Sequence, residues 1–368
     1  MSKLIITFHE GRYDEGRDLA ASIVESAVSD CSDVLKPGDS GNIFLSGAGI
    51  ALVNASPSQQ QRLEHARWSG SSPILAIEES RRFATSASTE LPQAISGPHL
   101  PPSPTAPGQW TGRGVKLAIL DTGLDPLHPD FLGRPRASRG FVGGSGSTVD
   151  GHGHGTHCIG IAAGGQLPLG GSYGLATGAD LYVGKVLDDL AMGDEWDIFL
   201  GLCWAVRECD CDVVLLAFNS GLQTSWVCYE RIATWALRTE QCLVVSAAGN
   251  SRRVPVGQPA NAQDIMAIAA LQNPNTLWSE SSPSGTTAGS EVNLAALGDS
   301  IRSAWTMPVR YANDSGTSMA AAFVAGAAAL WAEKTNLRGP ALWNCLRSNR
   351  SVLTLPARDV GDGLAVTP

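Results

Sequence analysis

Apolar and polar positions in the first 85 residues follow the pattern of a small mixed domain. Four apolar runs predict strands, at residues 4–8, 43–45, 50–53 and 74–77. Residues 16–28 predict a helix. A second helix is predicted in SPSQQQRLEHARW, where Ser56 and Gln59 have capping-box spacing and Pro57 suits the first helical position. The order strand, helix, strand, strand, helix, strand indicates a split βαβ fold, an α+β domain of ferredoxin-like type.

The pattern changes after a segment rich in Pro, Gly and Ser at residues 96–114, SGPHLPPSPTAPGQWTGRG. Beyond it come five continuous apolar runs, VKLAIL, ADLYVGKVL, CDVVLLAF, QCLVVSAA and DIMAIAAL. Such runs are typical of a parallel sheet covered on both faces by helices, an α/β fold of three layers. We therefore expect three parts, at residues 1–85, 86–110 and 111–368. Functional residues are expected just beyond the carboxyl ends of the strands.

Charge and composition exclude several classes of partner. The 26 basic and 35 acidic residues give a net charge of −9, which disfavours nucleic acid. No apolar run reaches membrane-spanning length, so no membrane partner is expected. The opening MSKLIITFHEGRYDEG shows no signal peptide, which predicts a cytoplasmic protein with reduced thiols, or a secreted one if the sequence has been trimmed.

Three of the eight cysteines, Cys203, Cys209 and Cys211, raise the question of a zinc site. No CxxC pair accompanies them, and GLCWAVRECDCDVVLL reads as a helix running into a buried strand. The favoured interpretation is three ordinary, semi-buried cysteines.

Four chemically useful residues stand at predicted ends of elements. Asp121 follows the strand VKLAIL, and Asn250 follows QCLVVSAA and Gly249. The loop DGHGHGTHCIG opens a predicted helix, and Ser318 begins another built from small residues. A carboxylate, an imidazole, a hydroxyl and an amide are the parts of an acyl-transfer enzyme: orienting acid, general base, nucleophile and oxyanion donor.

The segments AILDTGLDPLHPDF, GHGHGTHCIG, VVSAAGN and SGTSMAAAFVAG resemble, in order, the signature segments of the subtilisin-like serine proteases. The resemblance spans residues 110–368 and implies a serine endopeptidase with a subtilisin-like three-layer domain. It implies a triad of Asp121, His154 and Ser318. The side-chain amide of Asn250 and the backbone N–H of Ser318 would then form the oxyanion hole. The variant HGTHC is similar to the proteinase K branch of that family.

Of the three clustered histidines, the resemblance assigns the base to His154, the first histidine of HGTH. His157, one turn further along, is expected to pack or bond within the helix, and His152 to belong to the preceding loop. Three histidines at i, i+2 and i+5 converge poorly on one helix face, which disfavours a metal site.

The same resemblance implies that two short segments bind the substrate, and one of them departs from the family pattern. Where the family has Ser-Leu-Gly, this chain has Ala217, Phe218 and Asn219, and Asn219 is expected to crowd the edge of the primary pocket. Two arginines near the mouth of that pocket are read as solvated loop charges, with recognition of acidic residues as the alternative. These two are Arg252 and Arg253. The second substrate-binding segment comprises Ala247, Ala248 and Gly249.

No cofactor is required for this chemistry, but calcium is common in the family. Asp130, in HPD, matches a family ligand position, which makes a structural calcium ion an expectation. The stretch GGQLPLGGSYG lacks the asparagine-bearing loop that normally completes the site.

The N-terminal domain resembles the family's inhibitory propeptide, so the expected partners are a protein or peptide substrate and this domain as an intramolecular inhibitor. Self-cleavage is expected between Ala84 and Pro92. A cut after Ser86 would place Phe83 at the fourth position before it, whereas an arginine-lined pocket would favour a cut after Glu90. Two alternatives stay open, a maturation protease dedicated to one partner and a catalytically idle scaffold.

Overall fold

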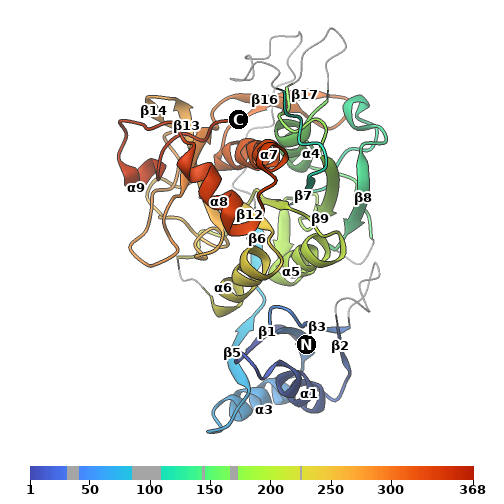
Figure 1. Ribbon diagram of the computed structural model, residues 1–368. Coiled ribbons are helices and arrows are strands. Elements are labelled where there is room, and N and C mark those ends of the chain that lie inside the picture. The colour runs from blue at the N-terminus through green and yellow to red at the C-terminus, as the bar shows by residue number, and fades with distance from the viewer. Residues whose placement is uncertain (31–40, 85–108, 143–145, 166–172, 224–225) are drawn as a thin grey trace.

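The computed structural model describes residues 1–30, 41–84, 109–142, 146–165, 173–223 and 226–368. The N-terminal domain carries two helices on one face of a five-stranded sheet, whose order is β2-β3-β4-β1-β5 (Figure 1). Its elements are β1 (Ser2–Phe8), α1 (Tyr13–Val24), β2 (Val28–Asp30), β3 (Asn42–Leu45), β4 (Ile50–Ala55), α3 (Pro57–Arg67) and β5 (Ile74–Glu79).

Two details of this domain were open to prediction from local sequence. The capping box at the start of α3 is confirmed, since the side chain of Ser56 accepts from the backbone of Gln59 and the Gln59 side chain accepts in return. The helix predicted at residues 16–28 is wrong at both ends. It ends at Val24 because Glu25 takes a left-handed conformation, with φ of 56°. The β-branched Val28 then begins a short strand that pairs with β3.

The second domain is built on an eight-stranded sheet in the order β14-β13-β12-β11-β7-β9-β8, with β15 also paired to β13. Every pairing is parallel except that of β13 with β14. The predicted parallel sheet is therefore confirmed. Its strands are β7 (Lys116–Asp121), β8 (Pro135–Gly140), β9 (Asp180–Lys185), β11 (Val213–Leu216), β12 (Leu243–Ala247), β13 (Met266–Asn273), β14 (Thr276–Leu277) and β15 (Leu294–Leu297).

Helices cover both faces of this sheet, because alternate side chains of each strand point to opposite sides. Leu117 and Ile119 of β7 pack with α4, α7 and α8, whereas Ala118 and Leu120 pack with α5 and α6 (Figure 1). The helices are α4 (His154–Ala163), α5 (Glu195–Cys203), α6 (Val227–Thr234), α7 (Thr317–Thr335), α8 (Gly339–Ser348) and α9 (Ala357–Val360). Short π-helical turns extend α5 and α6, at Trp204–Glu208 and Trp235–Thr239, and a 3₁₀ turn lies at Pro129–Phe131.

The two domains pack against each other through the uncovered face of the N-terminal sheet. Ile5, Ile43 and Leu52 belong to the same apolar core as α5 and α6. A further strand, β6 (Arg82–Ala84), leaves the N-terminal domain and pairs antiparallel with β10 (Met192–Asp194) of the second domain (Figure 1). A separate hairpin is formed by β16 (Ile301–Ala304) and β17 (Tyr311–Asp314).

In the described part of the chain, no helix combines the length and apolar character needed to cross a bilayer.

Candidate active site

Asp121 and His154 meet at the carboxyl end of the central strand. Asp121 is the last residue of β7 and His154 is the first residue of α4. Nδ1 of His154 lies 2.8 Å from Oδ1 of Asp121, and both side chains are buried. Oδ1 of Asp121 also accepts from the backbone N–H of Thr122 at 2.7 Å. The carboxylate can therefore fix the imidazole with Nδ1 protonated and leave Nε2 free to accept a proton.

The charge of this pair is set by two opposing effects. Burial disfavours the imidazolium, but the Asp121 carboxylate more than offsets this and raises the pKa of His154 well above its usual value. The thiol of Cys158 lies 3.9 Å from Nδ1 of His154. Burial raises the pKa of Cys158 to about 11, so this thiol stays neutral beside the base.

Ser318 lies in the first turn of α7, as the sequence predicts. Its Oγ donates a 2.7 Å hydrogen bond to the carbonyl of Ala217, just beyond β11. The hydroxyl is thus turned toward the end of β11. Catalytic hydrogen bonds commonly tighten only when substrate is bound.

The side-chain amide of Asn250 is oriented by Thr317, a residue that the sequence analysis did not single out. Oδ1 of Asn250 accepts from the backbone N–H of Thr317 at 2.9 Å and from its hydroxyl at 2.7 Å. The Thr317 hydroxyl in turn accepts from the backbone N–H of Gly249. These bonds occupy the oxygen of Asn250 and direct its NH₂ group, the donor, toward Gly316 at the start of α7.

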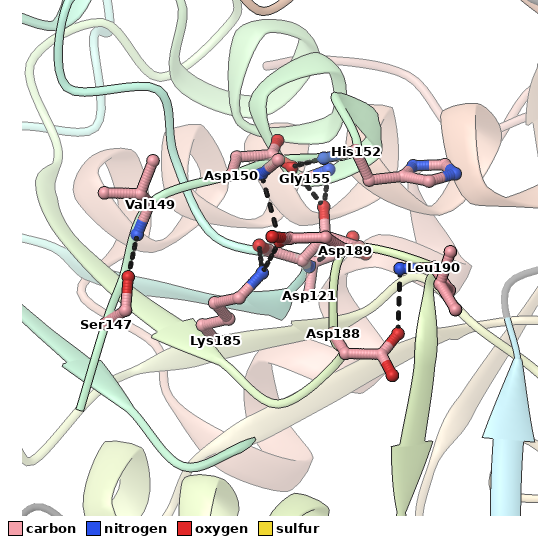
Figure 2. Close-up of polar contacts among 12 residues, drawn as sticks. Asp121, Ser147, Val149, Asp150, His152, Gly155, Lys185, Asp188, Asp189 and Leu190 are labelled. Carbon is pink, nitrogen blue, oxygen red and sulfur yellow. Dashed lines mark hydrogen bonds and ion pairs between the residues drawn. The ribbon is translucent and has the colours of Figure 1, made fainter. Parts of the chain in front are cut away.

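Asp150 is a second residue that the sequence analysis missed, and it forms the most connected hydrogen-bonding group of the site. Its Oδ1 accepts from the backbone N–H groups of His152 (3.0 Å) and Gly153 (2.7 Å) and from the hydroxyl of Thr122 (2.9 Å). Its Oδ2 accepts from the N–H (2.8 Å) and the hydroxyl (2.7 Å) of Thr156. Figure 2 shows the carboxylate beside the backbone of His152.

Thr122 completes the link between acid and base. Its hydroxyl donates to Asp150 and accepts from the N–H of Gly155 at 2.8 Å. The end of β7, which carries Asp121, is thereby joined to the start of α4, which carries His154. An acidic residue four positions before the base, in DGHGH, was the available sequence signal for this link.

Lys185 also binds the end of β7. This buried lysine donates to the carbonyl of Thr122 and to Oδ1 of Asp189, at 2.7 Å for the latter. Asp189 also accepts from the N–H of Gly151, in the histidine loop (Figure 2). The last residue of β9 therefore connects the ends of two adjacent strands with the loop that leads to His154.

The other two clustered histidines have separate surroundings. His152 lies in the loop before α4, as expected, where its Nδ1 accepts from the backbone of His154. Nε2 of His157 bonds outside its own helix, to the carbonyls of Ile301 (3.0 Å) and Ala312 (3.3 Å). Burial lowers the pKa of His157 to about 4, so it is neutral and ties α4 to the β16–β17 hairpin.

The two segments predicted to bind substrate lie at the ends of β11 and β12. Phe218 is fully buried, and the side chain of Asn219 is directed between the two segments. Nδ2 of Asn219 donates to the carbonyls of Ala248 (3.2 Å), Gly257 (3.0 Å) and, more weakly, Ala247 (3.4 Å). We expected this residue to crowd the edge of the primary pocket. Its side chain links the two segments through these hydrogen bonds, and its effect on the primary pocket stays a prediction.

Arg252 has a partner away from these segments. Its guanidinium forms an ion pair with the buried Asp359 of α9, at 3.0 Å and 3.2 Å. This pairing favours the interpretation of Arg252 as a structural loop charge.

The described residues around Asp130 do not by themselves fit a calcium ion. Oδ2 of Asp130 accepts from the hydroxyls of Tyr173 and Tyr311, each at 2.8 Å. In the part of the chain that the structure covers, one group of three metal-binding side chains lies close enough to share an ion, Asp121, His154 and Cys158. This group is the acid–base pair with the adjacent thiol. Part of the expected calcium loop, at residues 166–172, lies outside the described residues.

The three cysteines that raised a zinc question are free thiols. Cys203 and Cys211 are buried and Cys209 is partly buried, and none belongs to a group of three possible metal ligands in the described ranges.

This fold and site define a class of protein: a parallel α/β hydrolase with an aspartate at the end of a strand, a histidine at the start of one helix and a serine in the first turn of another. Residues 112–349 match the Subtilase family. The chain belongs to this family of serine proteases, and the sequence-based assignment is confirmed.

Individual relatives agree with the assignment. The chain is 36% identical to thermitase of Thermoactinomyces vulgaris over 238 aligned residues. This aligned region covers 62% of this chain and 80% of thermitase. The chain is also 36% identical over 261 residues to an alkaline protease of Alkalihalobacillus alcalophilus, covering 71% of this chain and 64% of that protein. The solved structure of sphericase superposes with a TM-score of 0.64 at 28% identity, covering 70% of this chain and 93% of sphericase.

Proposed function

We propose that this subtilase is a serine endopeptidase that uses Asp121, His154 and Ser318 as its triad and is made as a zymogen. The observation that carries the catalytic part is the buried 2.8 Å contact between His154, at the start of α4, and Asp121, at the end of β7. Family membership supplies the reaction class, hydrolysis of peptide bonds.

In the proposed mechanism, Ser318 Oγ attacks the scissile carbonyl carbon while Nε2 of His154 takes its proton. Asp121 stabilises the imidazolium that forms. The tetrahedral oxyanion accepts hydrogen bonds from the Asn250 NH₂ group and from the backbone N–H of Ser318. A first-turn amide of α7 lacks a helical partner and lies at the positive end of the helix dipole. His154 then protonates the leaving amine. A water activated by the same imidazole hydrolyses the acyl-enzyme and restores Ser318.

We propose that residues 1–85 are the inhibitory part of the zymogen. Antiparallel pairing of β6 with β10 is the way an extended peptide adds to an exposed strand. Phe83, within β6, is fully buried. Its ring lies 6.0 Å from the rings of both Phe218 and Tyr229. One of these, Phe218, belongs to a predicted substrate-binding segment, which supports a substrate-like position for β6.

Two carboxylates add to this interface. Glu78, at the end of the N-terminal sheet, accepts from the first backbone N–H groups of α6, those of Val227 and Cys228, each at 3.2 Å. Glu195, at the start of α5, accepts from the N–H of Arg81 at 3.0 Å. Helix N-termini favour negative charge, so the contact of Glu78 with α6 fits a stable complex between the domains.

Cleavage after Ser86, giving a mature chain that starts at Ala87, remains our proposal. The cut region lies outside the described residues, but Phe83 in an aromatic pocket suits the fourth position before such a cut. The engagement of Arg252 by Asp359 speaks against the alternative cut after Glu90.

Intact mass of the purified protein, compared with its Ser318→Ala variant, tests the proposal. We expect the wild type to lose its N-terminal part and to react with a fluorophosphonate, and the variant to stay whole and unlabelled. An unlabelled, uncleaved wild type would favour the idle scaffold. A mature chain starting beyond Gly108 would contradict the cleavage site and leave the triad in place.

A further inference from the structure

The strand β6 and the residue before it place two arginines against the catalytic domain, immediately ahead of Phe83. Arg81 and Arg82 lie two and one positions before the aromatic side chain. Side chains alternate in direction along a strand, so Arg81 and Phe83 share one face and Arg82 takes the other. Each arginine has its own partner on the catalytic domain.

Arg81 stacks on an aromatic ring. Its guanidinium carbon lies 3.5 Å from the ring centroid of Trp226, the residue that precedes α6. Trp226 is 8% exposed and Arg81 is exposed, so the guanidinium covers a buried ring from the solvent side, as in a cation–π contact at a surface. The backbone at Arg81 is also held from both sides: Glu195 donates its N–H to the Arg81 carbonyl and accepts from the Arg81 N–H.

Arg82 faces carboxylates that flank β10. Its Nη2 lies 3.9 Å from Oδ2 of Asp188, and its Nε lies 3.8 Å from Oδ1 of Asp194. Asp194 ends β10 and Asp188 lies in the turn before it, held by bonds to the N–H groups of Leu190 and Met192. Figure 2 shows the Asp188 carboxylate beside Leu190. The strand that receives the substrate is thus bordered by acidic groups.

We infer that the mature protease recognises an extended basic–basic–aromatic segment in its substrates, with an arginine or lysine five and six residues before the scissile bond. Trp226 binds the outer cation, Asp188 and Asp194 attract the inner one, and the aromatic pocket takes the next side chain. This inference rests on the proposed function, because a substrate must replace β6 on β10 to meet these groups. The substrate class is polypeptides with a dibasic pair directly ahead of a bulky aromatic residue.

The inference is tested with four p-nitroanilide substrates of the mature enzyme. One is the hexapeptide with the sequence of residues 81–86, RRFATS, and two others replace either arginine by alanine. The fourth is the tetrapeptide FATS. Replacing the outer arginine should lower kcat/KM roughly fivefold through KM, as expected for a cation–π contact. Replacing the inner one should lower it about twofold at low salt and less at high salt, as for a partly exposed ion pair.

Enzyme variants assign each effect to its residue. In Trp226→Ala the advantage of the outer arginine should vanish, and Trp226→Phe should restore part of it. Asp188→Asn keeps an oxygen for its turn and should reduce the advantage of the inner arginine, because Asp194 remains, and should leave that of the outer arginine unchanged. Asp210→Asn is the matched control, because it removes one negative charge, as Asp188→Asn does, from a different place. Asp210 pairs with Lys116 at the amino end of β7. This control should leave all four rates unchanged.

Two results overturn the proposals separately. Equal kcat/KM for all three hexapeptides, with the tetrapeptide hydrolysed, would refute the basic recognition and keep the protease. Hydrolysis of none of the four by an enzyme that also fails to react with a fluorophosphonate would refute the proposed function itself. Arginine effects that are undiminished in both Trp226→Ala and Asp188→Asn would place the recognition elsewhere.

Discussion

Replacing Asp150 by asparagine should disconnect the catalytic base from the rest of the site. The substitution keeps the size of the side chain and exchanges one acceptor oxygen for an NH₂ donor. If the amide nitrogen takes the place of Oδ2, it faces the N–H of Thr156, a donor. If it takes the place of Oδ1, it faces the N–H groups of His152 and Gly153. Either orientation leaves a buried backbone donor without an acceptor.

The size of the effect follows from these lost bonds. A buried donor left unpaired costs roughly 1–3 kcal/mol, and loss of a negative charge near the start of α4 adds about 0.3–1 kcal/mol. The free energy of unfolding should therefore fall by about 1–4 kcal/mol. Asp150 is joined to the helix that carries His154, so the imidazole should also lose its position. A misplacement of about 1 Å costs on the order of 10²-fold in rate. We expect kcat to fall between tenfold and a hundredfold, with a smaller change in KM.

Thermal unfolding should be measured in the Ser318→Ala background, which prevents autolysis. The value of kcat should be measured with a peptide p-nitroanilide in the enzyme that retains Ser318. Asp180→Asn is the control, because the carboxylate of Asp180 forms an exposed ion pair with Arg136 and its loss should change stability by less than about 1 kcal/mol. An Asp150→Asn enzyme with the stability and kcat of the wild type would refute the role assigned to this carboxylate.

The remaining predictions concern the base and the interface. His154→Ala and Ser318→Ala should each abolish hydrolysis, while His152→Ala should retain most of it; the reverse for the two histidines, measured as kcat/KM, would change the assignment of the base. Because the pKa of His154 is raised by Asp121 and the neutral imidazole is the active form, kcat/KM should fall as pH drops through this raised value. Asp121→Asn should move that inflection to lower pH in a pH–rate profile. Burial raises the pKa of Glu195 to about 7, so its contribution to zymogen stability is lost as pH rises from the usual carboxyl range through 7. N-terminal domain supplied in trans should therefore inhibit more weakly at pH 8 than at pH 5, and Glu195→Gln should flatten that difference in measured Ki; equal pH dependence in both enzymes would contradict it.

Local features of this fold could be predicted because they depend on neighbours in the sequence. The capping box of Ser56 and Gln59 needs residues three positions apart, and the start of α4 at His154 follows a glycine-rich loop. The parallel sheet could be predicted because its strands are continuously apolar. A strand with one face in solvent would instead alternate apolar and polar residues. The helix end near Val24 could not be predicted, since it depends on a left-handed Glu25 and on a strand partner in β3.

Much of the site depends on partners far away along the chain. The hydroxyl of Thr122 meets Asp150 across 28 positions, and the ring of His157 meets the carbonyl of Ala312 across 155. The sequence analysis could assign His157 to a buried helix position but could not identify a hairpin as its partner. The partners of Asn219 are also distant in the sequence, since its amide donates to the carbonyls of Ala248 and Gly257, which no local pattern identifies.

The sequence predicts that the backbone around His154 packs closely against other groups, but only the structure identifies those groups. The glycines on either side of His154 are the basis of this prediction. At Gly153 the backbone has a φ of +112°, and a Cβ there would lie 2.3 Å from the indole ring of Trp305. At Gly155 a Cβ would lie 2.4 Å from the carbonyl oxygen of Gly123, beside the strand end that carries the acid. Gly155 therefore lets the first turn of α4 lie directly on the end of β7, where the imidazole of His154 is within hydrogen-bonding distance of the Asp121 carboxylate.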